Sequence, residues 1–153
     1  MGATEKRAVE KLRERFGEAA VLELNEFRDE VTLVVRSELI AEISRFLRDE
    51  PELGYDFLSD LCGVDWPGRP ERFEVVYNLY SLRHRSRLRL KVRLPESAPA
   101  VPTVCGVWPT ANWHEREAYD LYGIRFAGHP DLRRILNPDD FGGFPYRKDF
   151  PIR

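Results

Sequence analysis

The sequence predicts an α+β fold in which a mixed β-sheet carries helices on one of its faces, giving two layers. The chain of 153 residues is long enough for one domain with a substantial core, and 42% of its residues are hydrophobic. Segments with helical and with alternating spacing of apolar residues follow one another in the order helix, two strands, helix, three strands. Because strands and helices do not alternate regularly, this order favours an α+β sheet, to which a short helix and an extended C-terminal tail are added.

The first half of the chain should contain two helices separated by two strands. Apolar residues at helical spacing predict the first helix over residues 5–16. Short segments with alternating apolar residues predict strands over residues 20–24 and 30–36. From Ser37 onwards, apolar residues again form one helical stripe, and this second helix should end before Pro51 because proline breaks helices.

Three further strands are expected over residues 55–64, 72–82 and 85–94. The last one has the clearest alternation, with apolar residues on one side and, on the other, Arg87, Arg89, Lys91 and Arg93. Such a row of cations is most often a solvated sheet face or a sheet edge protected by charge, and a protein-binding face is the next alternative. A nucleic-acid surface is disfavoured, because Tyr77 and Tyr80 have opposite parity and cannot both stack beside the arginines.

The stretch WHEREAYDLYGI, at residues 113–124, predicts a third, short helix. Asn112 is a suitable N-cap with Glu115 three residues later, and Gly123 fits the left-handed position that ends many helices. On a helical wheel Glu117 falls within the apolar arc, so we expect it to be buried and ion-paired. Glu115 should contribute only a cap contact. Two further residues, Arg116 and Asp120, should form an i,i+4 pair on the opposite side.

This stretch has no spacing typical of a catalytic or metal site. It begins His114-Glu115, as the zinc-protease motif H-E-x-x-H does, but Ala118 stands where the second histidine would be. A site made of His114, Glu115 and His129 has no recognised spacing in its support. Glu115 and Glu117 are separated by about 200° around a helix at ~100° per residue, so they cannot act on one substrate atom. We therefore expect no catalytic, cofactor-binding or metal-binding residues.

Composition and charge narrow the functional classes further. A formal net charge of −2 provides no overall field for nucleic acid or an anionic membrane. The first residues lack the apolar region of a signal peptide, and no apolar run approaches the ~18 residues of a membrane span. Cys62 and Cys105 are expected to be buried free thiols in a reducing cytoplasm.

The last third of the chain resembles a known family. From VWPTANWHEREAYDLYGIRFAGHPDLRRIL to PYRKDFP, it is similar to the 30 kDa subunit, also called the C subunit, of respiratory NADH:quinone oxidoreductase (complex I). The signature is ERE-x-x-D-L-Y, then six residues, then H-x-x-x-R-x-I-L. In this chain its positions are Glu115, Arg116, Glu117, Asp120, His129 and Arg133.

The resemblance implies a non-catalytic structural subunit of the peripheral arm of a proton-pumping NADH:quinone oxidoreductase, on the cytoplasmic side of the inner membrane. Family members bind no NAD, FMN, iron–sulfur cluster or quinone themselves, since these belong to other subunits. They brace the quinone-site large subunit and the neighbouring iron–sulfur subunits. Membrane-bound energy-converting hydrogenases and related ferredoxin- or quinone-coupled complexes use homologous subunits, so the electron donor stays open.

Residues 127–153 are expected to form an extended partner-binding tail that follows a domain of residues 1–126. Prolines and the pair Gly142-Gly143 prevent a regular helix or central strand over most of it, yet aromatic and charged residues are spaced as in binding hot spots. The residues expected to bind the partner are Phe141, Phe144, Tyr146, Arg147, Lys148, Asp149 and Phe150. Because family members pass such a segment over the quinone-site subunit, the part after about Ile135 should order on binding. The alternative is a tail that folds back on its own sheet.

Overall fold

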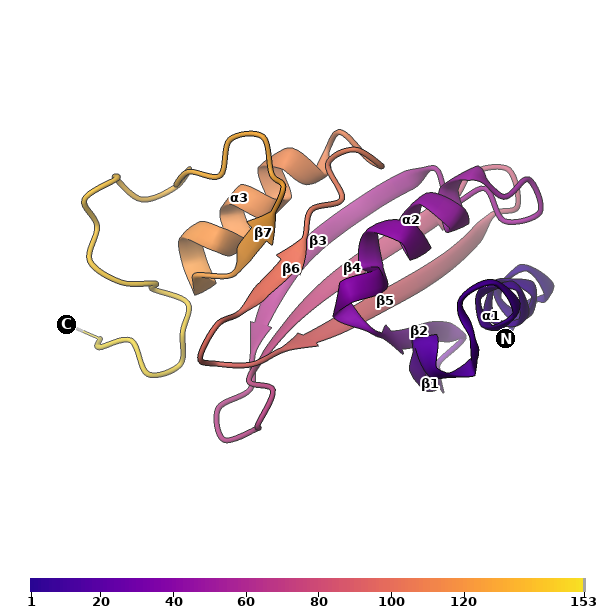
Figure 1. Cartoon of the computed structure of the whole chain (residues 1–153), viewed down its shortest axis with the longest axis horizontal. Coiled ribbons are helices and arrows are strands. Elements are labelled where there is room, and N and C mark those ends of the chain that lie inside the picture. Colours follow the sequence, from indigo (N-terminus) through magenta and orange to yellow (C-terminus); the bar gives the residue numbers. More distant parts are fainter. Residues whose placement is uncertain (153) are drawn as a thin grey trace.

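The computed structural model describes residues 1–152. In this part of the chain five strands form one mixed sheet, and three α-helices lie on one of its faces (Figure 1), which confirms the two-layer α+β prediction. The helices are α1 (Ala3–Phe16), α2 (Ile40–Asp49) and α3 (Ala111–Tyr122). The strands of the sheet are β1 (Val21–Phe27), β2 (Glu30–Val35), β3 (Phe57–Asp65), β4 (Phe73–Ser81) and β5 (Ser86–Leu94). Two short strands, β6 (Ala100–Pro102) and β7 (Arg125–Ala127), pair in parallel to form a second, small sheet.

The main sheet has the order β1-β2-β5-β4-β3, and only β2 and β5 run parallel among its neighbouring strands within residues 1–152. Leu33 of β2 lies opposite Leu90 of β5, and Leu90 lies opposite Tyr77 of β4; all three are completely buried. This alternation places the core between the sheet and the helices. None of the helices within residues 1–152 combines the length and the apolar character that crossing a membrane requires.

The element boundaries differ from the expected ones mainly at helix starts. A 3-10 turn, Ser37–Leu39, precedes α2, and no side chain caps either helix end there. The expected cap at Asn112 is wrong, because α3 already begins at Ala111 and Thr110 holds the N-cap position without a side-chain bond. Gly123 ends α3 in the left-handed conformation (φ 78°), as predicted.

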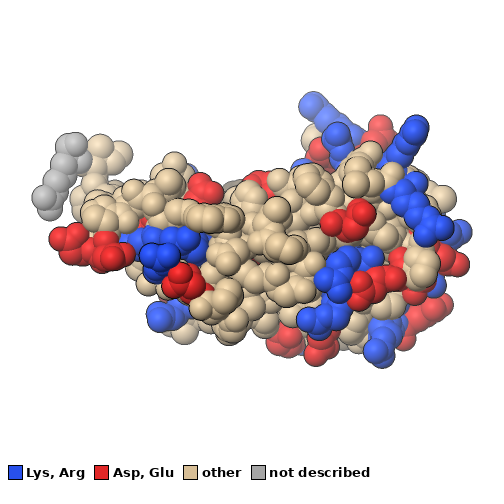
Figure 2. Space-filling model, turned by 90° about the horizontal axis from the view of Figure 1, so that it is seen from above, with Lys and Arg blue, Asp and Glu red and all other residues tan. Residues whose placement is uncertain are grey.

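The basic side of β5 faces away from the helices, but β5 lies inside the sheet, so the edge interpretation is wrong. Arg93 forms two hydrogen bonds of 2.9 Å with Glu23, and Arg89 lies 3.0 Å from Glu30. Neighbouring strands thus neutralise part of this row of cations. Figure 2 shows Lys and Arg interspersed with Asp and Glu over the half of the molecule that holds α1 and α2, so no single-sign field covers that face.

Helix α3 covers β3 through a close contact at a glycine. Gly63 of β3 is buried on the helix side of the sheet, opposite Val75, and a Cβ atom there would come within 2.6 Å of Cδ2 of Tyr122. The absence of a side chain at Gly63 therefore lets the last turn of α3 approach the sheet.

We expect Gly63→Ala to lower the free energy of unfolding by about 1–3 kcal/mol, because overpacking forces Tyr122 and α3 to shift. Gly106→Ala is the matched control, since no atom lies within 4 Å of its ideal Cβ position. The control should change stability by less than about 1 kcal/mol. Urea denaturation of both variants measures the difference, and equal effects would contradict the close contact.

Candidate functional site

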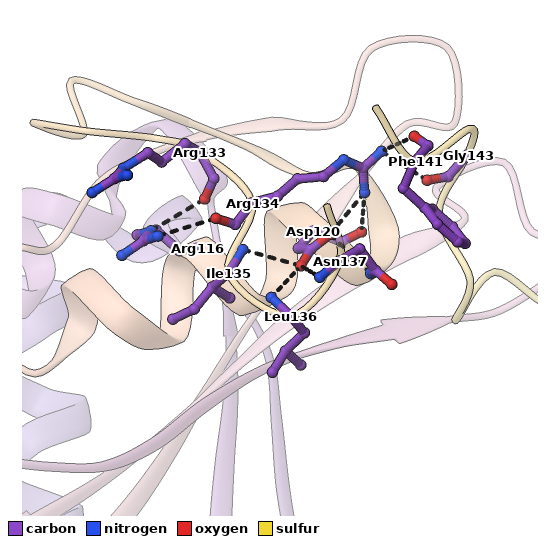
Figure 3. A network of polar contacts seen from close by, with 9 residues as sticks. All are labelled: Arg116, Asp120, Arg133, Arg134, Ile135, Leu136, Asn137, Phe141 and Gly143. Carbon is purple, nitrogen blue, oxygen red and sulfur yellow. Dashed lines mark hydrogen bonds and ion pairs between the residues drawn. The ribbon is translucent and has the colours of Figure 1, made fainter. Parts of the chain in front are cut away.

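The residues of the family-like stretch meet the C-terminal tail at a buried carboxylate, that of Asp120 in the last turn of α3 (Figure 3). Its Oδ2 accepts hydrogen bonds from the backbone N–H groups of Ile135, Leu136 and Asn137 at 3.1, 2.7 and 2.9 Å. Its Oδ1 accepts bonds from Arg134 Nη1 at 2.7 Å and from Asn137 Nδ2 at 2.9 Å. Burial alone would raise the pKa of Asp120, but these bonds outweigh it and hold the pKa well below its usual range.

Arg134 connects this carboxylate to a later part of the tail. Its Nη2 donates to the carbonyl oxygens of Phe141 and Gly143 at 3.0 and 2.9 Å, so one guanidinium links Asp120 with two tail carbonyls. The same guanidinium lies 5.1 Å from the centre of the Phe144 ring. Arg134 was absent from the predicted site residues, although its position beside Arg133 in the family-like stretch was a usable signal.

Arg116 and Asp120 do not form the expected i,i+4 pair on the solvent side of α3. Both are buried, and Arg116 donates from Nε and Nη2 to the carbonyl oxygens of Arg133 and Arg134, each at 3.1 Å. Arg133 contributes its backbone here, while its side chain is exposed and pairs with Asp131 at 2.8 Å. The polar side of α3 is therefore the side that the tail covers.

The expected roles of Glu115 and Glu117 are reversed. Glu117 is exposed, so its predicted burial is wrong, whereas Glu115 is completely buried. Glu115 accepts hydrogen bonds from the Thr103 hydroxyl, from the Val104 N–H at 3.0 Å and from the Cys105 thiol at 3.1 Å. Burial raises the pKa of Glu115, and these hydrogen bonds act against the rise. Its role is to hold the segment after β6 against α3.

Cys105, Glu115 and His129 form a cluster whose possible ligand atoms all lie within 4.8 Å of one another. The hydrogen bonds of His129 do not suit a metal ligand, because Nδ1 accepts the Asp131 N–H at 2.9 Å and Nε2 faces the Asn112 carbonyl at 3.2 Å. Burial also raises the pKa of Cys105 to about 12, which keeps the thiol protonated at neutral pH. The cluster therefore anchors loops through hydrogen bonds.

The other histidine and cysteine candidates lie apart from this cluster. His114 points to Asp60, with Nδ1 and Oδ1 3.6 Å apart, so the considered set of His114, Glu115 and His129 does not form. Both cysteines are free, but Cys62 is exposed and Cys105 is only partly buried, so the expectation of two buried thiols is wrong.

A second docking point for the tail lies at the base of the β3–β4 hairpin. The guanidinium of Arg72 is buried and donates to both carboxylate oxygens of Asp65, at 2.6 and 2.8 Å, and to Glu96 at 2.8 Å. It also donates to both oxygens of Asp149 in the tail, at 3.0 and 3.3 Å. The Lys148 N–H donates to Asp65 at 2.7 Å. Hydrogen bonds from Arg72 lower the pKa of both aspartates.

Aromatic contacts complete the path of the tail between these two points. Arg147 donates from Nε to the Tyr122 carbonyl at 2.7 Å, and its guanidinium lies 4.8 Å from the ring centres of Phe73 and Phe144. The Tyr146 ring meets Tyr122 edge-to-face at 5.8 Å. Phe141 and Phe150 stack at 6.0 Å.

The seven tail residues assigned to a partner thus all contact the chain itself. This arrangement matches the alternative of a tail that folds back, and it differs from the expectation that the segment orders only on binding. The physical reason is that Asp120 and the Arg72–Asp65 pair offer buried charges that the tail satisfies. Partner binding by these residues stays a prediction.

We expect Asp120→Ala to lower the free energy of unfolding by roughly 3–5 kcal/mol, because it strands the Arg134 charge and three backbone N–H groups. Glu117→Ala is the matched control on the exposed side of the same helix and should stay within about 0.5 kcal/mol of the wild type. Urea denaturation measures both values. A small loss for Asp120→Ala would mean that the tail contacts do not stabilise the fold.

Docking of the tail should also depend on pH. Because Asp120, Asp65 and Asp149 have lowered pKa values in the folded protein, their contribution is present above the unfolded value, about 4, and is lost as pH falls through the folded values. Glu115, with a raised pKa, contributes with the opposite sign, so the segment it holds is not weakened by acid. Below about pH 4 the amide resonances of Ile135 to Asn137 should move before those of the core strands. Simultaneous loss of tail and core signals would contradict this order.

Comparisons with known proteins agree with the fold and with the family-like stretch. The family model for "Respiratory-chain NADH dehydrogenase, 30 Kd subunit" matches residues 33–153. The C subunit of the NADH-quinone oxidoreductase of Geotalea uraniireducens is 52% identical over 151 residues, which cover 99% of this chain and 90% of that protein. A solved trypsin-resistant fragment of Nqo5 is 35% identical, with a TM-score of 0.70 over 84% of this chain and 99% of the fragment.

A more distant structure shows likeness of fold alone. A chain of the membrane-bound sulfane sulfur reductase, an archaeal respiratory membrane complex, is 24% identical, with a TM-score of 0.77 over 97% of this chain and 86% of that chain. The family model spans the sheet from β2 onwards, α3 and the tail with both of its docking points. The chain therefore belongs to the family of the 30 kDa subunit of respiratory-chain NADH dehydrogenase.

Proposed function

We propose that this chain is a non-catalytic structural subunit of the peripheral arm of a proton-pumping NADH:quinone oxidoreductase. The family match over residues 33–153 is the observation that carries this proposal. In it, NAD, FMN, iron–sulfur clusters and quinone are bound by other subunits. The chain braces the quinone-site large subunit and the neighbouring iron–sulfur subunits from the cytoplasmic side of the membrane.

The docked tail supports a bracing role because it presents a defined surface. Three large apolar side chains on α3 and the tail point outward, namely Trp113, Leu136 and Tyr146, with exposed fractions of 61%, 63% and 57%. Exposed aromatic and apolar groups of this kind are typical of protein interfaces. The buried polar contacts of Asp120 and Arg72 hold the backbone, while these side chains are free to meet a partner.

A tail that is ordered before binding suits a permanent subunit. Ordering a free chain costs roughly 1–2 kcal/mol per residue in backbone entropy, which would weaken any contact that the tail makes. In this protein the chain's own hydrogen bonds to Asp120, Tyr122 and Asp65 offset that loss before the partner arrives. Affinity then depends on the outward side chains.

The test is incorporation into the assembled complex. We expect the tagged wild-type chain to co-purify with the large quinone-site subunit and the iron–sulfur subunits. Leu136→Asp combined with Tyr146→Asp should prevent stable incorporation while leaving cooperative unfolding close to that of the wild type, because both side chains are exposed. Removal of residues 137–153 should also prevent incorporation, but with a lower free energy of unfolding, since it deletes donors to Asp120 and Asp65.

The control is Glu14→Lys on the exposed side of α1, which should assemble normally. Normal incorporation of the double variant would contradict the assignment of the partner surface to the tail. A purified, active complex that never contains this chain would contradict the proposed function itself.

A further inference from the structure

We propose that the end of the sheet opposite the docked tail is a second protein-binding surface, which takes an acidic, apolar segment of another subunit. This inference rests on the proposed function, because it requires the chain to sit among other subunits. A groove of about 650 Å³ lies there, formed by β2, β3, β4 and β5. Tyr80, Arg87 and Arg89 line it and alternate with the core residues Leu79 and Leu88, so they lie on the face without helices.

The groove is distant from the tail. Strand β4 runs from Phe73, beside which Arg147 docks, to Ser81 at the groove end. Nine residues at ~3.3 Å each place these two ends about 26 Å apart. A partner segment in the groove therefore makes contacts separate from those of the tail.

The floor of the groove is apolar and open. Phe57 pairs with Tyr80 across β3 and β4, and Phe57 remains 48% exposed. Leu82, just after β4, is 63% exposed. No part of residues 1–152 covers these side chains further. Grouped exposed aromatic and apolar residues beside arginines have the composition of interface hot spots.

The charge at this end indicates the chemistry of the occupant. Arg83, Arg85 and Arg87 are exposed, and none of them forms an ion pair within residues 1–152. By contrast, Arg89 and Arg93 on the same strand pair with carboxylates of β1 and β2. The cations left over lie at one end of an apolar groove, where they complement Asp or Glu on a partner.

The carboxylates that line the groove do not change this assignment. Glu30 is paired with Arg89 at 3.0 Å, and Asp60 lies 3.6 Å from His114. A second copy of the chain is a poor occupant, because two such ends would bring their unpaired arginines together. A nucleic acid or an anionic lipid surface would use the arginines but leave the apolar floor unfilled.

The first test places a photoreactive benzophenone amino acid at Phe57 in the assembled complex, with Glu14 on α1 as the control position. Irradiation and mass spectrometry should link Phe57 to an Asp- and Glu-containing segment of another subunit, and Glu14 should not reach that segment. A link from Phe57 to a second copy of this chain, to lipid or to nucleic acid would overturn the proposal. Absence of any link at Phe57 in a complex that contains the chain would do so as well.

The second test changes charge without touching the tail. The triple variant Arg83→Glu, Arg85→Glu and Arg87→Glu should reduce the amount of chain retained in the purified complex at least tenfold, whereas the corresponding lysine variant should retain most of it. Thermal unfolding of the isolated variants confirms folding. Wild-type retention of the glutamate variant would overturn the inference alone, because the proposed function fails only if the wild-type chain is absent from the complex.

Discussion

The buried carboxylate of Asp120 is the constraint on which the C-terminal third of the structure depends. It lies in the last turn of α3, where the helix dipole disfavours a negative charge, and it has no contact with solvent. A charge in this position requires donors, and the structure supplies them from residues 134–137. The chain after β7 must therefore turn back across α3, which decides where the tail begins.

The other polar contacts follow from this turn. Once residues 133–134 lie against α3, their carbonyl oxygens need donors, and Arg116 provides them. Arg134 then extends the same arrangement to Phe141 and Gly143, so the tail reverses direction within a few residues. The reversal leads the chain past Tyr122 to the base of the β3–β4 hairpin. There Arg72 closes the path by binding one carboxylate of the sheet and one of the tail.

The comparison with the sequence separates local from distant causes. Alternation of apolar residues along β5 and β4 was sufficient to predict the strands and their buried side, because each strand's own neighbours determine both. The orientation of α3 could not be predicted in this way. A helical wheel assigns the apolar side to the core, but a segment about 15 residues later covers the polar side of α3. Glu115 and Glu117 were reversed for this reason, and Arg134 was missed because its partner is not adjacent in sequence.

The tail is held by directional polar contacts more than by an apolar core, and this difference bears on its function. Apolar packing tolerates sliding, whereas carboxylates with several fixed donors accept one register of the chain. Buried charged networks of this kind contribute more to a unique arrangement than to net stability, since desolvation of the charges offsets much of their attraction. A segment fixed in this way presents Leu136 and Tyr146 at constant positions relative to the sheet. The sheet in turn relates that surface to its opposite end, where the unpaired arginines lie. A rigid connection between two distant surfaces is the mechanical property that a bracing subunit needs, and here it arises from the charges of Asp120 and Arg72.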